Sequence, residues 1–311
     1  MNTNGKANAG RNTKDESDQR KDREGKANSK EMKLELPNFT EKSELIDYLV
    51  SNKSKLISQK KSVTKESDGV SHCVELVIDK DKSEFTVKAG MQSVEIPDTA
   101  TQIKVRSIIN TTKLFDSHGD VHLDQLWNKS LKENKGFSLI QEHQFNFKGT
   151  ISDNVKAFTK QIAWHDMGIN FEGKTQALVF DSLIDKNENE FMFEKYRTGK
   201  VNNHSVGMQY VKIDLAVNDD RYEKEYAIWG KYFDEIANKE DVLEAGYFWA
   251  VSEAKIIEGS AVKRGSNWAT PTLSIEQTKE EPPVGTPKTE PPKSTLKAKE
   301  LIKYYQPKNH I

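Results

Sequence analysis

The chain has 311 residues, of which 35% are hydrophobic and 31% are charged, and its 47 basic and 48 acidic side chains leave a net charge of -1. No overall electrostatic field therefore draws it to nucleic acid or to an anionic membrane. The single cysteine, Cys73, excludes an intramolecular disulfide and a multi-cysteine zinc site, and no apolar run has the length of a signal peptide or a membrane span. We expect a soluble protein of a reducing compartment, not secreted, with one folded core of roughly 150 to 230 residues.

The N-terminal part is predicted to be a polar tail followed by a helix. Residues 1–36 are rich in Asn, Lys, Asp, Gly and Arg and have almost no apolar side chains, which is typical of a disordered segment. Within 37–62, apolar residues recur at spacings of three, four and seven, which predicts one amphipathic helix of about 18 residues with Thr40 or Ser43 as its N-cap.

The next part of the chain is predicted to be a run of antiparallel strands, because short alternating segments are separated by turn-forming residues. These segments are 73–78, 84–87, 93–96 and 102–109. A polar loop and a helix over about 123–134 follow. His118, Asp120, His122 and Asp124 alternate through this region, a pattern that admits a metal site but is more often a solvated loop.

The central segment is predicted to alternate strands with one helix. Residues 137–143 predict a strand that ends at His143, and alternating aromatic residues continue this pattern to residue 151. Residues 155–163 fit a helix or a strand. A clear strand covers 176–184, and a helix over 188–197 is expected to stop at Gly199.

The last part of the core begins with the stretch 201–211. Ser205 introduces an alternating strand that extends to Val217, with a bulge expected near residues 210–211. Residues 220–245 have helical spacings and are predicted to be an insertion, after which 247–262 returns to a strand and the pattern ends beyond Trp268. Residues 271–311 are expected to contain a proline-rich linker and one short terminal helix.

Three of these strands bring together residue types suited to nucleophilic catalysis. A hydroxyl nucleophile needs a nearby base and an acid that orients the base. His143, Ser205 and either Glu258 or Glu253 would supply them. His204 is next to Ser205, but its side chain would point to the other face of the strand. His165 lies in an aromatic-rich loop. From the residues alone, either histidine remains an alternative candidate for the base.

Four segments then resemble one known family. They are 116–121 (DSHGDV), 139–143 (LIQEH), Gly199 with 204–208 (HSVGM), and 257–267 (IEGSAVKRGSN). In this order the set resembles the prohead maturation proteases of tailed bacteriophages, which share their serine-protease fold with the herpesvirus assemblin. The resemblance covers about 105–269. Gly265-Ser266 replaces the family's usual Pro-Ala, and Met208 replaces an aromatic residue.

The resemblance implies an α+β fold with a mostly antiparallel, barrel-like β core surrounded by helices, here within 63–270. Carried over position by position, it implies Ser205 as nucleophile, His143 as base and Glu258 as the third member, with Glu253 in reserve. Backbone amides at Val206 or Gly207 are expected to stabilise the oxyanion.

The resemblance also implies a function. It is that of a serine endopeptidase that acts inside the immature capsid, in the host cytoplasm. Its expected substrates are the major capsid protein and the scaffold, and it is expected to cleave its own chain as well. No metal, cofactor, nucleic acid or membrane is expected, and a homo-oligomer is compatible with it. Two alternatives are a catalytically silent capsid-assembly or scaffold protein with the same fold, and a metal-dependent hydrolase built on His118, Asp120 and His122.

Overall fold

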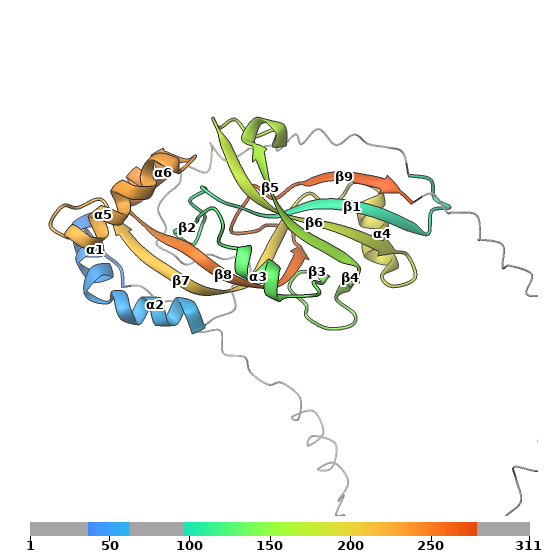
Figure 1. The fold of residues 1–311 in the computed structure, drawn as a ribbon, viewed down its shortest axis with the longest axis horizontal. Coiled ribbons are helices and arrows are strands. Elements are labelled where there is room, and N and C mark those ends of the chain that lie inside the picture. Colours follow the sequence, from blue (N-terminus) through green and yellow to red (C-terminus); the bar gives the residue numbers. More distant parts are fainter. Residues whose placement is uncertain (1–36, 63–95, 279–311) are drawn as a thin grey trace, which may run out of the picture. The chain divides into compact units, whose positions relative to one another are not determined.

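The structure is a computed structural model that describes residues 37–62 and 96–278 (Figure 1). The predicted tail 1–36, residues 279–311 of the segment predicted as linker and terminal helix (271–311), the predicted strands at 73–78, 84–87 and most of 93–96, and Cys73 lie outside these residues. The described chain forms two compact units. The first contains 37–62, 112–133 and 206–257, and the second contains 96–111, 134–205 and 258–278.

The N-terminal helical region consists of two helices, α1 (Lys42–Ser51) and α2 (Lys53–Ser62), instead of the single helix predicted. The break is at Asn52, which has φ -103° and ψ 9° and ends α1, its backbone N–H donating to the carbonyl oxygen of Tyr48. The apolar periodicity continues from α1 into α2, so the sequence pattern does not reveal the break between the two helices. Leu45, Ile46, Leu49 and Leu56 of this pattern are buried, whereas Val50 and Ile57 are half-buried.

The rest of the first unit combines strands with the inserted helices. Its elements are β2 (Asp120–His122), α3 (Asn128–Glu133), most of β7 (His204–Val217) and β8 (Tyr247–Ala261), and α5 (Glu223–Tyr232), η3 (Phe233–Glu235) and α6 (Lys239–Ala245). β2 pairs in parallel with β8, Asp120 lying opposite Trp249. The helical insertion predicted at 220–245 is present, whereas α3 is shorter than the helix predicted at 123–134.

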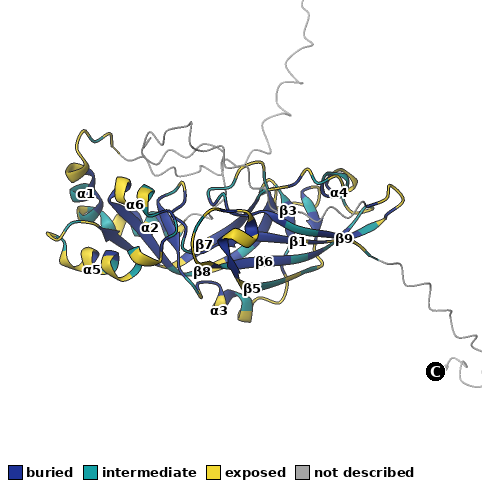
Figure 2. Ribbon diagram, turned by 90° about the horizontal axis from the view of Figure 1, so that it is seen from above, coloured by how far each residue is buried: buried dark blue, intermediate teal, exposed yellow. Residues whose placement is uncertain are grey.

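The second unit contains an antiparallel sheet with the strand order β5-β6-β1-β9. These strands are β1 (Gln102–Thr111), β5 (Val155–Ala163), β6 (Lys174–Asp185) and β9 (Thr272–Gln277), and the short 3-10 helix η2 (Trp164–Met167) follows β5. β9 lies beyond the point where the sequence pattern was expected to end. β1, β6 and β8 are largely buried (Figure 2).

A second sheet has the order β2-β8-β3-β4, with β7 pairing to β8. Its short strands are β3 (Leu139–Gln141) and β4 (Thr150–Ser152). β3 is parallel to β8 with Leu139 opposite Gly259, while β3 and β4 are antiparallel. The α+β class is confirmed. Over the described residues, however, the strands form two open sheets and one of these is mixed, so a closed barrel is not supported.

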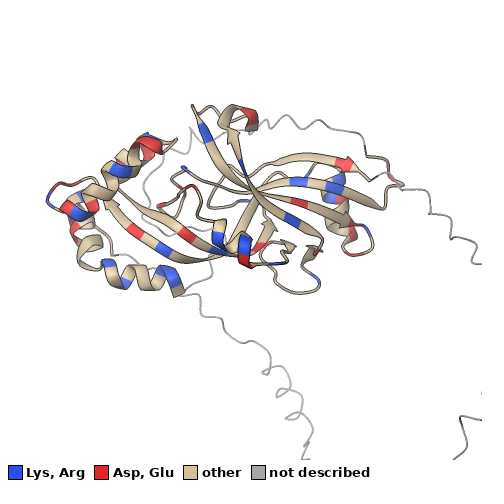
Figure 3. Cartoon of the chain, viewed as in Figure 1, with Lys and Arg blue, Asp and Glu red and all other residues tan. Residues whose placement is uncertain are grey.

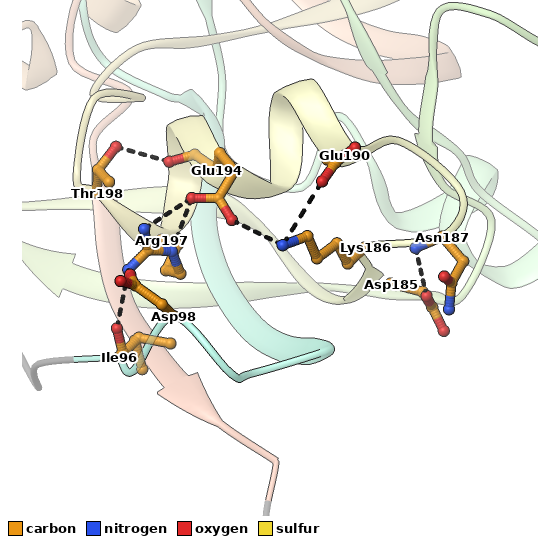
Figure 4. Close-up of polar contacts among 9 residues, drawn as sticks. All are labelled: Ile96, Asp98, Asp185, Lys186, Asn187, Glu190, Glu194, Arg197 and Thr198. Atoms are coloured by element: carbon orange, nitrogen blue, oxygen red, sulfur yellow. Dashed lines mark hydrogen bonds and ion pairs between the residues drawn. The ribbon is translucent and has the colours of Figure 1, made fainter.

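Helix α4 (Glu190–Arg197) packs through apolar side chains on one face and forms ion pairs on the other. Phe193 and Tyr196 are fully buried. On the outer face, Arg197 contacts Asp98 at 2.7 Å and Glu194 at 2.8 Å (Figure 4). Exposed ion pairs contribute little to stability, whereas burial of two large aromatic side chains contributes several kcal/mol, about 2 to 3 each. The apolar face therefore anchors α4.

Charges of both signs are interspersed along the described elements in the view of Figure 3, as the net charge near zero leads one to expect. Within the described ranges, no helix is both long enough and apolar enough to cross a bilayer.

Candidate active site

His143 is placed by a left-handed turn at the end of β3. Glu142 and His143 have φ values of 45° and 56°, a conformation that side chains other than glycine seldom adopt. The turn is tied to β8 by two hydrogen bonds. Glu142 N–H donates to the carbonyl oxygen of Ala261 at 2.9 Å, and His143 N–H donates to Ser260 Oγ at 2.8 Å.

The turn brings the imidazole of His143 onto the carboxyl group of Glu258. Nδ1 of His143 and Oε1 of Glu258 are 2.6 Å apart, and the two side chains are only 5% and 4% exposed. A carboxylate at Nδ1 favours the tautomer that carries its proton on that nitrogen, which leaves Nε2 as an acceptor. The pair thus has the geometry of a base and its orienting acid.

The reserve acid, Glu253, is engaged elsewhere. It forms ion pairs with Lys212 at 2.6 Å and Lys129 at 3.4 Å, and the hydrogen bond from Lys212 lowers its pKa. Between the two acids considered from the sequence, Glu258 is the one that the structure joins to His143.

Ser205 lies on β7 beside the same part of β8. Val262 N–H donates to the carbonyl oxygen of Asn203 at 3.1 Å, whereas His204 N–H donates to Thr270 on the other side of β7. The start of β7 therefore lies beside the end of β8, the strand that pairs with it and that carries both Glu258 and Ser260.

Ser205 is 8% exposed, and its hydroxyl makes no hydrogen bond within the described residues. The predicted donors Val206 and Gly207 follow it on β7 and are buried. Their role at an oxyanion stays a prediction.

The two other candidate histidines have different surroundings. His204 is fully buried, with Nε2 2.9 Å from the hydroxyl of Tyr196 and Nδ1 3.0 Å from the carbonyl oxygen of Thr270. Burial lowers its pKa to about 4, so the ring is neutral at pH 7. His165 is 78% exposed beside Asp166, on η2.

The aromatic alternation after His143 forms a loop rather than the predicted continuation of the strand. Phe145 and Phe147 are 66% and 99% exposed, and β4 contributes only three residues. Asn146 closes the loop, since its Oδ1 accepts the N–H of Gly149 at 2.9 Å. The segment bearing the base is therefore open to solvent at its tip.

A second group of buried ionisable side chains surrounds Asp120 in the first unit. Its carboxylate accepts hydrogen bonds from Lys60 Nζ at 2.5 Å and from the hydroxyl of Tyr210 at 2.7 Å, and the same hydroxyl is 3.2 Å from His122 Nε2. Asp116 accepts the N–H groups of His118 and Asp120, and burial followed by the charge of Asp120 raises its pKa to about 6.

This group revises the metal-ligand set that the sequence suggested. Among the described residues, Asp116, His118 and Asp120 have ligand atoms within 4.8 Å of one another. Asp124 instead bonds the hydroxyl of Thr112 at 2.6 Å. The ammonium of Lys60 already supplies positive charge to Asp120. The sequence does not identify Lys60 or Asp116 as members of this buried group. Lys60 and Asp120 are 60 residues apart, and a contact over that separation leaves no local pattern in the sequence.

Comparisons with known proteins identify no relative: no family model, no curated protein and no solved structure matches the chain. The resemblance to prohead proteases thus depends on the four sequence segments.

Proposed function

We propose that the chain is a serine endopeptidase of the Ser-His-Glu type, which processes the major capsid protein and the scaffold inside an immature phage capsid in the host cytoplasm. The observation that carries the proposal is the 2.6 Å contact between His143 Nδ1 and Glu258 Oε1, on the strand that pairs with the one carrying Ser205. A histidine oriented through Nδ1 by a buried carboxylate is the base arrangement of serine hydrolases. The proposal needs no closed barrel, because acid and nucleophile come from adjacent strands.

The proposed reaction begins when Ser205 Oγ attacks the scissile carbonyl carbon while His143 Nε2 accepts the hydroxyl proton. The negative charge of Glu258 stabilises the resulting imidazolium, and the same histidine then protonates the leaving amine and activates water for deacylation. His143 and Ser205 must first come into contact. Hydrogen bonds of this kind are often long without substrate and tighten when it binds.

Strand geometry distinguishes the two predicted oxyanion donors. The N–H of His204 points away from β8, so the N–H of Val206, two residues further along, does the same. The N–H of Gly207 points toward β8, where β7 forms its strand pairing. Val206 is therefore the better candidate, since its donor is not directed into that pairing.

The test uses the purified full chain and a fluorophosphonate probe, which reacts with activated serine hydroxyls. We expect labelling at Ser205, identified by peptide mass spectrometry, and at least a 100-fold slower reaction in His143→Ala, since a general base contributes about 10² to 10⁴ in rate. His165→Ala is the matched control, because it removes an exposed histidine that also lies beside a carboxylate.

A second arm co-expresses the chain with its capsid protein and scaffold precursors. Wild type should shorten them and Ser205→Ala should not. Processing by folded Ser205→Ala would refute the proposal, and if a chelator also stopped it, a metal-dependent hydrolase would be favoured. A folded wild-type chain that neither labels nor cleaves would support the silent capsid-assembly protein.

A further inference from the structure

Ser260 is a fully buried serine whose hydroxyl lies between β3 and the turn bearing His143. Its Oγ accepts the N–H of His143 at 2.8 Å and donates to the carbonyl oxygen of Ile140 at 3.3 Å. Both bonds are to backbone groups. The hydroxyl therefore ties the last residues of β3 to the histidine that follows them.

The register between β3 and β8 shows why this turn is needed. The strands are parallel, with Ile140 opposite Ser260 and Gln141 opposite Ala261. If β3 continued as an extended strand, His143 would lie opposite residue 263. That position is five residues beyond Glu258, or roughly 17 Å at about 3.3 Å per residue, too far for a direct hydrogen bond. The chain must turn back for the imidazole to reach the carboxyl group.

Two consecutive left-handed residues make that reversal, and each costs roughly 1 to 2 kcal/mol for a side chain other than glycine. Such a conformation persists only where other contacts hold it. Two backbone N–H groups of the turn donate to β8, Glu142 N–H to Ala261 and His143 N–H to Ser260 Oγ. Of these two bonds, only the second has a side-chain acceptor, so it is the one that a substitution can remove.

We propose that Ser260 is the positioning residue of the catalytic base: its hydroxyl holds the turn at His143 and so places the imidazole on Glu258. The expected effect on the reactivity of Ser205 rests on the proposed function. The expected effect on the position of the imidazole does not. Glu258 on β8 faces the ring, and the exposed Glu142 precedes it in the loop. Losing the contact with Glu258 should leave the imidazole without the carboxylate that orients it through Nδ1.

The test compares Ser260→Ala with Ser152→Ala. Ser152 is a matched control because it is also fully buried, accepts the N–H of Asn154 at 3.1 Å and donates to the carbonyl oxygen of Leu183 at 2.6 Å, yet is tied to neither His143 nor Glu258 in the described contacts. Both variants lose a similar pair of bonds. A purely structural effect should therefore be similar in the two.

Two readouts are measured on the full chain. Fluorophosphonate labelling of Ser205 should be about 10-fold or more slower in Ser260→Ala than in Ser152→Ala. In a Ser205→Ala background, the Nδ1–H proton of His143 is observed by NMR, where its short hydrogen bond to Glu258 Oε1 should give a downfield resonance. That resonance should be lost in Ser260→Ala, as in Glu258→Gln, and should be retained in Ser152→Ala. Ser260→Cys, which replaces the hydroxyl with a weak donor and acceptor of similar shape, should show the same trend.

The outcomes separate this inference from the proposed function. An unchanged Nδ1–H resonance of His143 in folded Ser260→Ala, or in Ser260→Cys if the alanine variant does not fold, overturns the positioning role even where Ser205 still labels. A wild-type chain that never labels refutes the peptidase, while the NMR spectrum still decides whether Ser260 places the ring.

Discussion

Replacing Lys60 with methionine should destabilise the first unit by about 3 to 5 kcal/mol, the usual effect of removing one partner from a buried ion pair. Lys60 and Asp120 are 2.5 Å apart, with side chains 3% and 0% exposed. Methionine retains most of the aliphatic length but leaves the carboxylate of Asp120 without its cation. Asp116 adds a second negative charge nearby, so the effect should be at the upper end of that range.

The assay is urea unfolding followed by circular dichroism, at pH 8 and at pH 5. Without Lys60, the two carboxyl groups should bind a proton more readily in the folded than in the unfolded state. A raised folded-state pKa means that stability falls as pH rises, so the loss caused by Lys60→Met should be smaller at pH 5 than at pH 8. Lys55→Met is the control, since it makes the same change at an exposed position of α2 and should alter stability by less than about 0.5 kcal/mol.

Adding Asp120→Asn to Lys60→Met removes the unpaired charge and should recover at least about 2 kcal/mol, because an ion pair replaced as a whole is often close to neutral. The electrostatic reasoning would be refuted if the double variant were no more stable than Lys60→Met. It would equally fail if Lys60→Met and Lys55→Met had the same midpoint at both pH values.

Three other predictions concern single buried positions. Asp116→Asn should stabilise the chain by up to about 3 kcal/mol at pH 7, with the gain disappearing toward pH 4 in urea titrations, because a carboxyl group whose pKa is raised to about 6 destabilises the fold once it ionises. The buried neutral ring of His204 has a pKa of about 4, so the free energy of unfolding of the wild type should fall by about 2 kcal/mol between pH 7.5 and pH 5. In folded His204→Gln, the free energy of unfolding should not show this decrease. Gly259→Ala should cost about 1 to 3 kcal/mol by calorimetry, since its Cβ would lie 2.5 Å from the ring of Phe180, whereas Gly136→Ala meets no atom within 4 Å and should be nearly neutral. A Gly259→Ala variant as stable as Gly136→Ala would contradict the overpacking.

The central strands could be predicted from sequence because their hydrophobic patterns are long. β1, β6, β7 and β8 each have 10 to 15 residues and lie close to the predicted ranges. β5 was ambiguous because only its last two residues are buried, and β9 was missed because its six residues include only two buried ones. A strand with little burial has no clear period of two, so its place in a sheet is set by pairing and not by pattern.

The candidate site was predictable only in part. His143, Ser205 and Glu258 belong to segments with a recognisable order, and the structure brings His143 to Glu258. The left-handed turn was not predictable, because glutamate does not favour this conformation and the enrichment of histidine in it is too small to mark one position. The role of Ser260 could be recognised only once the parallel register of β3 and β8 was known.

The two buried polar groups differ in their access to a substrate, and this difference decides which of them can support the proposed chemistry. Asp120 is completely buried, and its carboxylate is bonded to an ammonium and a phenol hydroxyl. Such a group stabilises a fold but offers no atom to a polypeptide. His143 is also a buried side chain, but it belongs to a loop whose next aromatic residues, Phe145 and Phe147, are exposed. The loop that bears His143 therefore presents exposed side chains to a polypeptide, whereas the carboxylate of Asp120 presents none, and this favours the site at His143 for the proposed chemistry.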